Sequence, residues 1–238
     1  MTGSKKRMPR KHIFSFPPLI ILTLLLSAIS RAAFPQSPDE ELWTGAGIRY
    51  DINNKFRFDL EQECRWKDHI GTFKFTFTEM GLQWRISRIF SIRGKYRYLF
   101  VPNDHDAGKF YLDGNINLSK KKFPLSLGYR LRYERGNEFV VSKTENWLRN
   151  QIEMNWNMSR IADPYIGWEN FRRLDGINEA RANRYSFGID WKLSKIISLT
   201  SFYIFEDEFN VKHPQDRHIL GIRLTYRFRD KGNVSQGQ

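Results

Sequence analysis

The sequence predicts an all-β fold, namely an antiparallel, up-and-down transmembrane β-barrel of 10–12 strands with short periplasmic turns and longer extracellular loops. Two observations lead to this prediction. Runs of alternating apolar and polar residues come in pairs joined by a tight polar turn, and the pair repeats about every 35 residues. After the N-terminal region, no stretch shows the periodicity of a helix. The short turns fall near Asn53, Arg88, Lys121, Ile161 and Lys195.

The alternation defines each strand and separates its two faces. In residues 55–66 the even positions begin Phe56, Phe58 and Leu60, and every odd position is charged. Because successive side chains in a strand point to opposite faces, one face is apolar and the other carries charge. In chain order, strands are expected at residues 42–51, 55–65, 72–86, 91–100, 110–119, 123–134, 145–158, 164–172, 181–193, 197–206 and 217–228.

Two of these strands raise a difficulty. Within residues 72–86 the alternation changes phase between Phe77 and Met80, which indicates a bulge near Thr78 or a half-strand that stands clear of the membrane. Five hairpins account for ten strands, and residues 42–51 are an eleventh alternating run. Either residues 32–41 supply a twelfth strand, or the N-terminal segment lies in the lumen before it joins the wall.

The N-terminus has the layout of a cleaved secretory signal peptide. Five basic residues precede an apolar stretch from Ile13 to Ile29, and small residues follow it. Three segments are therefore expected: a signal peptide at residues 1–33, a barrel at 34–228 and a polar tail at 229–238. The formal net charge of +13 includes these five basic residues, and removing them leaves +8 for the mature chain.

Three features favour lipid outside the barrel. The expected turns and loops alternate in length, with short joins on one rim and long ones on the other, as in outer-membrane barrels. Aromatic residues gather near the short turns as an interfacial girdle. The final strand alternates Leu220, Ile222, Leu224, Tyr226 and Phe228 with polar residues. A soluble secreted barrel with its apolar face inward, binding an apolar ligand, is the alternative, because alternation alone does not distinguish inside from outside.

The chain also resembles an uncharacterised family of Gram-negative outer-membrane β-barrels of the Bacteroidetes type, classified as a domain of unknown function. The resemblance implies the same fold and an outer-membrane location, reached by Sec export, and it assigns no activity. It rests on Leu42-Trp43, Leu60-Glu61-Gln62-Glu63, Phe77-Thr78-Glu79-Met80-Gly81, Tyr129-Arg130-Leu131-Arg132-Tyr133, Trp147-Leu148-Arg149-Asn150 and the strand from Gly221 to Phe228.

The polar faces of the strands are expected to line the lumen, with 14 basic and 9 acidic side chains. These charges either pair and fill a narrow barrel, or they line water and favour anions. The candidate lumen-lining residues are Arg57, Glu61, Glu63, Glu79, Arg93, Arg97, Arg130, Arg132, Arg149, Glu153, Asp190 and Arg223.

These features predict a narrow channel or a structural, surface-interaction barrel without enzymatic activity or cofactors. The expected partners are outer-membrane lipid and lipopolysaccharide, the barrel assembly machinery, and small anionic solutes. Nucleic-acid binding is disfavoured, because basic residues share their face with acids. An outer-membrane hydrolase remains the alternative, with a His as general base beside a carboxylate at the extracellular rim; its candidates are His69, His105, His213 and His218, with Asp68, Asp104, Asp106 and Asp216.

Overall fold

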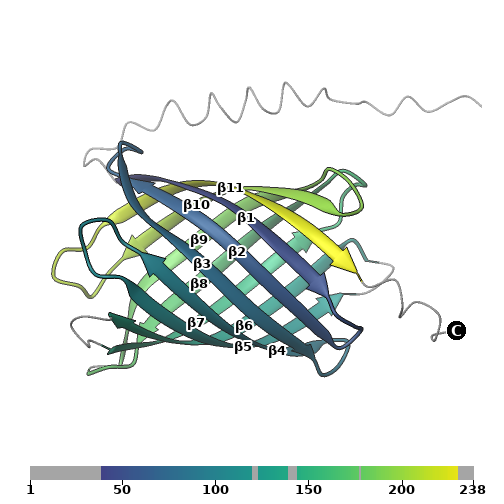
Figure 1. Ribbon diagram of the computed structural model, residues 1–238, viewed down its shortest axis with the longest axis horizontal. Helices are drawn as coiled ribbons and strands as arrows, with labels where there is room; N and C mark the ends of the chain where they lie inside the picture. Colours follow the sequence, from purple (N-terminus) through teal and green to yellow (C-terminus); the bar gives the residue numbers. More distant parts are fainter. Residues whose placement is uncertain (1–38, 120–122, 139–143, 177, 230–238) are drawn as a thin grey trace, which may run out of the picture. The chain divides into compact units, whose positions relative to one another are not determined.

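The computed structural model describes residues 39–119, 123–138, 144–176 and 178–229. The expected signal peptide and nearly all of the expected tail lie outside these residues. The described chain is built from strands (Figure 1), and it contains no helix long and apolar enough to cross a membrane. The strands are β1 (Asp39–Asp51), β2 (Phe56–Lys67), β3 (Thr72–Arg85), β4 (Phe90–Phe100), β5 (Ala107–Ser119), β6 (Leu125–Glu138), β7 (Thr144–Trp156), β8 (Ala162–Arg173), β9 (Glu179–Lys192), β10 (Ile197–Glu208) and β11 (Asp216–Arg229).

The strands form a closed barrel in which each pairs antiparallel with its neighbours along the chain. The ring closes between β1 and β11, which pair in parallel from Asp39↔Arg217 to Asp51↔Arg229 (Figure 1). The predicted barrel of 10–12 strands is confirmed, with eleven strands among the described residues. Of the segment expected to supply a twelfth strand or to lie in the lumen, residues 39–41 belong to β1, and the rest lies outside the described residues. An odd number of strands in a meander leaves the first and last pointing the same way, and a parallel ladder joins them.

The two rims differ less in loop length than expected. We call the rim where β1, β3, β5, β7, β9 and β11 end the turn rim, and four or five residues separate consecutive strands there. We call the opposite rim, where β2, β4, β6, β8 and β10 end, the loop rim, and four to seven residues separate consecutive strands there. The asymmetry is small because strands continue into the expected loops, as where β6 runs on to Glu138.

Four of the turn-rim connections share one local device that explains the regular beat of the sequence. At each, a short polar side chain accepts hydrogen bonds from backbone amides two and three residues further on, which stabilises a tight turn. The acceptors are Asn53 Oδ1 and the Oγ atoms of Ser87, Ser159 and Ser194.

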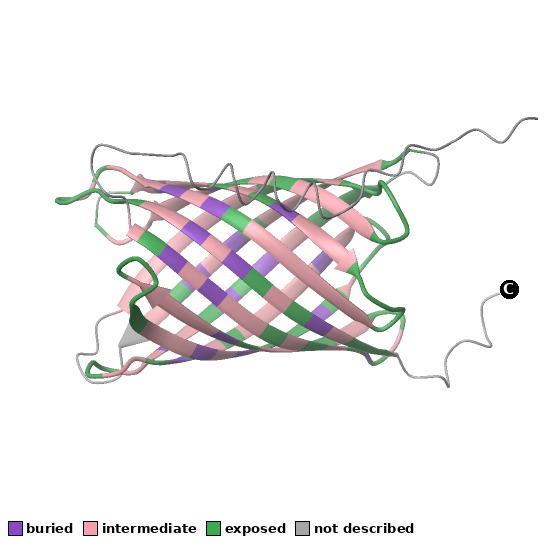
Figure 2. Cartoon of the chain, turned by 90° about the horizontal axis from the view of Figure 1, so that it is seen from above, coloured by how far each residue is buried: buried purple, intermediate pink, exposed green. Residues whose placement is uncertain are grey.

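The apolar faces of the strands point outward and the charged faces point into the barrel. Along the strands, buried residues alternate with more exposed ones (Figure 2). Outward apolar side chains are exposed, such as Leu82 at 51%, whereas inward carboxylates such as Glu63 and Asp113 are 1% exposed. The alternation is therefore that of a barrel with a polar interior.

The expected bulge near Thr78 is wrong. In β3 the register shifts at Lys74, between Phe73, which pairs with Trp66, and Phe75, which pairs with Arg65. Phe77 is 1% exposed inside the barrel, and the phase change in the sequence arises because aromatic rings occupy inward positions there.

Two inward glycines hold aromatic rings of the neighbouring strand. Gly221 lies opposite Phe202, and Gly188 lies opposite Tyr165. A Cβ at either glycine would overlap the ring, so each ring lies flat over the neighbouring strand. Tyr165 therefore faces the lumen and is not part of the aromatic girdle, contrary to the prediction from its position near a turn.

Candidate functional site: the charged lumen

Charged side chains encircle the lumen, and we call the following eleven residues, one from each strand, the charge belt. Carboxylates come from β1, β3, β5, β8 and β10, and arginines come from the other six strands. The carboxylates are Glu41, Glu79, Asp113, Glu169 and Glu206, and the arginines are Arg65, Arg97, Arg132, Arg149, Arg184 and Arg217.

Several neighbouring members of the belt are joined by short ion pairs. Arg132 donates two hydrogen bonds to Asp113, at 2.6 and 2.8 Å. Arg97 lies 2.7 Å from Glu79, and Arg217 Nη1 lies 2.5 Å from Glu206. Because such pairs lie directly opposite each other in the sheet, they stabilise the ladder as cross-strand pairs.

One join in the belt brings like charges together. Arg132 on β6 lies directly opposite Arg149 on β7. Arg149 is held by two carboxylates at once: Nη1 donates to Glu134, and Nε and Nη2 donate to Glu169, all at 3.0 Å. Each guanidinium group thus has carboxylate partners of its own, Asp113 for Arg132 and Glu134 with Glu169 for Arg149, and these offset the repulsion between the two groups.

Several belt arginines also stack on inward aromatic rings. The guanidinium carbon of Arg65 lies 3.4 Å from the ring centre of Trp43, and that of Arg97 lies 3.7 Å from Phe77. Arg149 lies over Phe171 at 4.3 Å. Stacking leaves the edges of the planar group free to donate hydrogen bonds to carboxylates, so each arginine is fixed in two directions.

The acids and bases occupy different depths. Eight of the carboxylates are buried against the barrel wall, whereas Arg132 is the one basic side chain of the described residues in the same class of burial. Carboxylate side chains are shorter than those of Lys and Arg, which agrees with their deeper burial. The buried carboxylates are Glu41, Asp51, Glu63, Glu79, Asp113, Glu134, Glu169 and Glu206.

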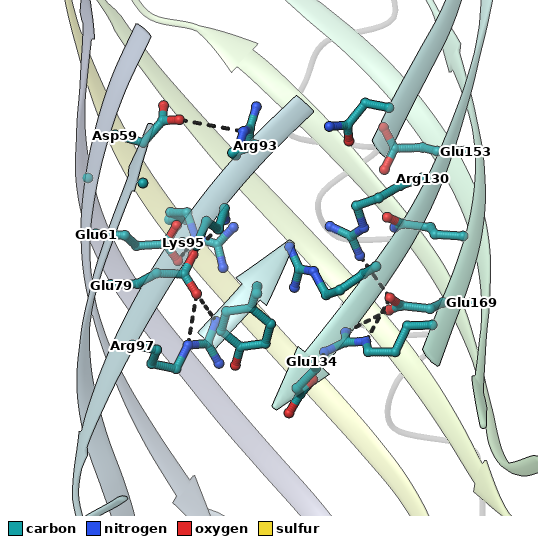
Figure 3. A pocket seen from close by; sticks show the side chains of 18 of the residues that line it. Asp59, Glu61, Glu79, Arg93, Lys95, Arg97, Arg130, Glu134, Glu153 and Glu169 are labelled. Carbon is teal, nitrogen blue, oxygen red and sulfur yellow. Dashed lines mark hydrogen bonds and ion pairs between the residues drawn. The ribbon is translucent and has the colours of Figure 1, made fainter. Parts of the chain in front are cut away.

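Inside the barrel lies a polar cavity of about 670 Å³ to which all eleven strands contribute. Figure 3 shows charged side chains pointing into it from several sides. Its lining includes seven acidic residues, namely Asp59, Glu61, Glu79, Glu134, Glu145, Glu153 and Glu169. It includes eleven basic residues, namely Arg49, Arg65, Arg93, Lys95, Arg97, Lys109, Arg130, Arg132, Arg149, Arg184 and Arg223.

Nine of the twelve candidate lumen residues line this cavity, and three lie beside it. Arg57 pairs with Asp51 at 2.8 Å near the turn rim. Glu63 lies beneath Arg65 and Arg223, at 2.7 and 2.6 Å. Asp190 accepts a hydrogen bond from Thr200 at 2.5 Å. The nine lining residues are Glu61, Glu79, Arg93, Arg97, Arg130, Arg132, Arg149, Glu153 and Arg223.

Sequence reasoning missed several inward charges near strand ends. Glu41, Glu206 and Arg217 complete the belt across the seam, where Arg217 lies 3.9 Å from Glu41. These charged residues share the inward face with Trp43, Ile204 and Ile219. An inward face that mixes apolar and charged residues does not follow the expected alternation, so the charges were not assigned to the lumen. Pairing β1 with β11 would have revealed them.

The candidate histidines have different surroundings, and one of them, His69, lies beside a carboxylate. The Asp104 carboxylate accepts the backbone amide of His105 at 2.7 Å, and Asp106 accepts the Tyr98 hydroxyl. His69 Nδ1 lies 3.7 Å from Glu40 and is largely exposed. His218 shares a hydrogen bond with the Tyr203 hydroxyl on the outer face of the barrel. His213 lies in the connection before β11.

The remaining candidate features are metal ligands and the thiol of Cys64. Within the described ranges, no group of three or more His, Cys, Asp or Glu is arranged to hold a metal ion. Cys64 carries a free thiol 3.4 Å from the Thr76 hydroxyl.

At the loop rim, the Asp175 carboxylate accepts hydrogen bonds from the backbone and side-chain amides of Asn146, and these lower the pKa of Asp175 from its ordinary value.

Comparison with known proteins identifies a family and a distant structural likeness. The family described as "Protein of unknown function (DUF2490)" matches residues 40–218. No curated protein matches the chain. Among solved structures, OpdL of Pseudomonas aeruginosa is similar, with 13% identity over 69% of this chain and a TM-score of 0.35. The chain spans about half the length of OpdL, since the match covers 54% of it.

Proposed function

The chain belongs to the DUF2490 family of proteins of unknown function, and we propose that it is an outer-membrane β-barrel whose narrow, charged lumen admits small anionic solutes. The single observation that carries the proposal is the excess of basic side chains around the central cavity. Eleven basic and seven acidic residues line it, and carboxylates are more deeply buried than basic groups among the described residues.

The outer face supports a location in lipid. Outward apolar residues recur on all strands, and Met80, Leu82 and Trp84 on β3 are each about half exposed. In water such a surface would be unfavourable, whereas lipid requires it. The soluble barrel with an inward apolar face gains no support, because its faces would have to be reversed.

The charges that line the cavity favour the entry of anions over that of cations. A solute in the cavity meets eleven basic and seven acidic side chains, and fixed charge at a constriction raises the local concentration of the opposite ion. The lumen is polar and charged throughout, which matches a hydrated solute better than an apolar ligand.

Location is tested by membrane fractionation together with heat-modifiable gel mobility. We expect the protein in the outer-membrane fraction, with faster migration before boiling than after it, because a closed barrel resists detergent until it is heated. Recovery in the soluble periplasmic fraction without detergent would contradict the proposal.

Selectivity is tested in planar bilayers under a salt gradient. Arg49 and Lys109 line the cavity with 43% and 34% of their side chains exposed. The pair of changes Arg49→Gln and Lys109→Gln should shift the reversal potential toward cations. Glu145→Gln, at a cavity-lining carboxylate that is 33% exposed, should shift it the other way. A cation-selective wild-type barrel, or one without measurable current, would refute the proposed channel.

A further inference from the structure

We propose that the lumen contains a specific site for a small oxyanion, a phosphate or carboxylate group, formed by Arg93, Asn115 and Arg130. The inference rests on the proposed anion-accepting lumen and assigns it a binding position. All three residues line the central cavity, and they belong to the consecutive strands β4, β5 and β6.

The three side chains are neighbours on the inner wall. Asn115 lies directly opposite Arg130 across the β5–β6 ladder. Arg93 lies opposite Asp113, which precedes Asn115 by two residues on the same face of β5. Figure 3 shows Arg93 and Arg130 directed into the cavity. The register thus brings two guanidinium groups and one amide to the same region of the lumen.

Each of the three carries a nitrogen that lacks an acceptor. Arg93 Nε, Asn115 Nδ2 and Arg130 Nε are buried and have no hydrogen-bond partner among the described residues. Each arginine has one hydrogen bond through Nη2, from Arg93 to Gln83 at 2.6 Å and from Arg130 to Glu169 at 2.8 Å. Buried donors without acceptors are unfavourable, so a ligand with several oxygens would stabilise the site by accepting hydrogen bonds from these three nitrogens.

The two arginines have the freedom to meet such a ligand. Each keeps 24% of its side chain exposed, unlike Arg132 on the same strand as Arg130, which is 4% exposed and bound by both oxygens of Asp113. A planar guanidinium that is held at one corner can turn its remaining N–H groups toward an oxyanion, and Arg is suited to bidentate recognition of phosphate and carboxylate.

A carboxylate next to the site competes with the ligand. Asp59 lies 3.7 Å from Arg93 Nε and from Arg49 Nε, and neither of its oxygens accepts a hydrogen bond from the described residues. It neutralises Arg93 through space without occupying the donors. Removing its charge should therefore strengthen oxyanion binding.

Binding is measured by isothermal titration calorimetry of the purified barrel in detergent with sodium phosphate and, separately, sodium acetate, at constant ionic strength set with chloride. We expect saturable binding of both oxyanions. Arg93→Gln and Asn115→Leu should each weaken it by about tenfold or more, since each removes a donor, and Asp59→Asn should tighten it. Arg57→Gln is the matched control, because Arg57 is an inward arginine that pairs with Asp51 outside the cavity lining.

The outcomes separate this site from the proposed channel. Absence of saturable heat, or equal loss of binding in Arg57→Gln and Arg93→Gln in folded, heat-modifiable protein, would overturn the site. Bilayer current without phosphate binding would leave the channel standing and refute the site. Phosphate binding that follows the variant order in a barrel without current would support the site and refute conduction.

Discussion

At the scale of single residues, the direction of a side chain decides its effect. Ile152 points outward and is 44% exposed, and the adjacent Gln151 lines the cavity. Ile152→Arg should lower the free energy of unfolding by roughly 2–4 kcal/mol, because it places a cation toward lipid. Gln151→Arg should have a much smaller effect. Urea unfolding of barrels refolded into lipid vesicles measures both, and similar losses would mean that the outer face does not contact lipid.

The inward glycines give a second test at this scale. Gly221→Ala should be strongly destabilising, because the new Cβ would overlap the ring of Phe202, and overpacking of this kind costs about 1–3 kcal/mol. Gly94→Ala is the control, since a Cβ at Gly94 meets no atom within 4 Å. Thermal unfolding monitored by circular dichroism compares them. A Gly221→Ala barrel as stable as Gly94→Ala would exclude the flat packing of Phe202.

The sequence predicted the inward or outward direction of most side chains, and its errors have a common cause. Alternation shows which residues share a face, but it does not show which face is outside. Aromatic residues are then assigned to the outer face because they are apolar. Phe77, Tyr111 and Trp43 break this assumption, since each is buried inside the barrel as a platform for an arginine. A ring that stacks on a guanidinium cannot be distinguished by pattern from one that meets lipid.

At the scale of elements, the parallel seam between β1 and β11 is the feature most open to test. Ala46 and Leu224 are register partners on the outer face. With Cys64 replaced by Ser, the pair Ala46→Cys and Leu224→Cys should form a disulfide under mild oxidation, and the pair Ala46→Cys and Leu220→Cys should not. Non-reducing gels of the folded barrel show the result. Cross-linking of the second pair but not the first would contradict the register.

The last strand also carries a prediction. Phe228 ends the alternating outer face of β11, and its ring lies 4.3 Å from that of Tyr226. Phe228→Ala should slow insertion into vesicles more than deletion of residues 230–238, if the strand and not the tail guides assembly. The rate at which heat-modifiable protein appears measures insertion. If the variant without residues 230–238 inserts more slowly than Phe228→Ala, the assembly signal lies in the tail.

Strands were predictable as elements, but their closure was not. Eleven alternating runs were visible in the sequence, and the described part of the chain contains eleven strands. Which strands pair at the seam depends on residues some 180 positions apart, such as Thr44 and Ile222, and no local pattern records that contact. The loops were overestimated because Gly136 and its neighbours read as a turn although β6 continues through them.

At the scale of the whole molecule, the parallel closure sets at which rim the first strand begins and the last strand ends. β1 starts at the loop rim beside the start of β11, and β11 ends at the turn rim. If the turn rim faces the periplasm, Asp39 faces the outside. An epitope inserted before Asp39 should then be accessible to antibody on intact cells, and one after Arg229 should not. The reverse labelling would mean that the barrel is inserted in the opposite sense.

The odd number of strands limits how the signs of the charges can alternate around the charge belt. Two signs can alternate without fault around a ring only when the ring has an even number of members. With eleven strands, the charge belt must repeat a sign somewhere, and it does so once, where Arg132 meets Arg149. Substitutions can move such a defect around the circumference, but they cannot remove it while every strand contributes a charge. A barrel with an odd number of strands and one belt charge on each strand therefore always has at least one pair of adjacent like charges, and here both charges of that pair are positive.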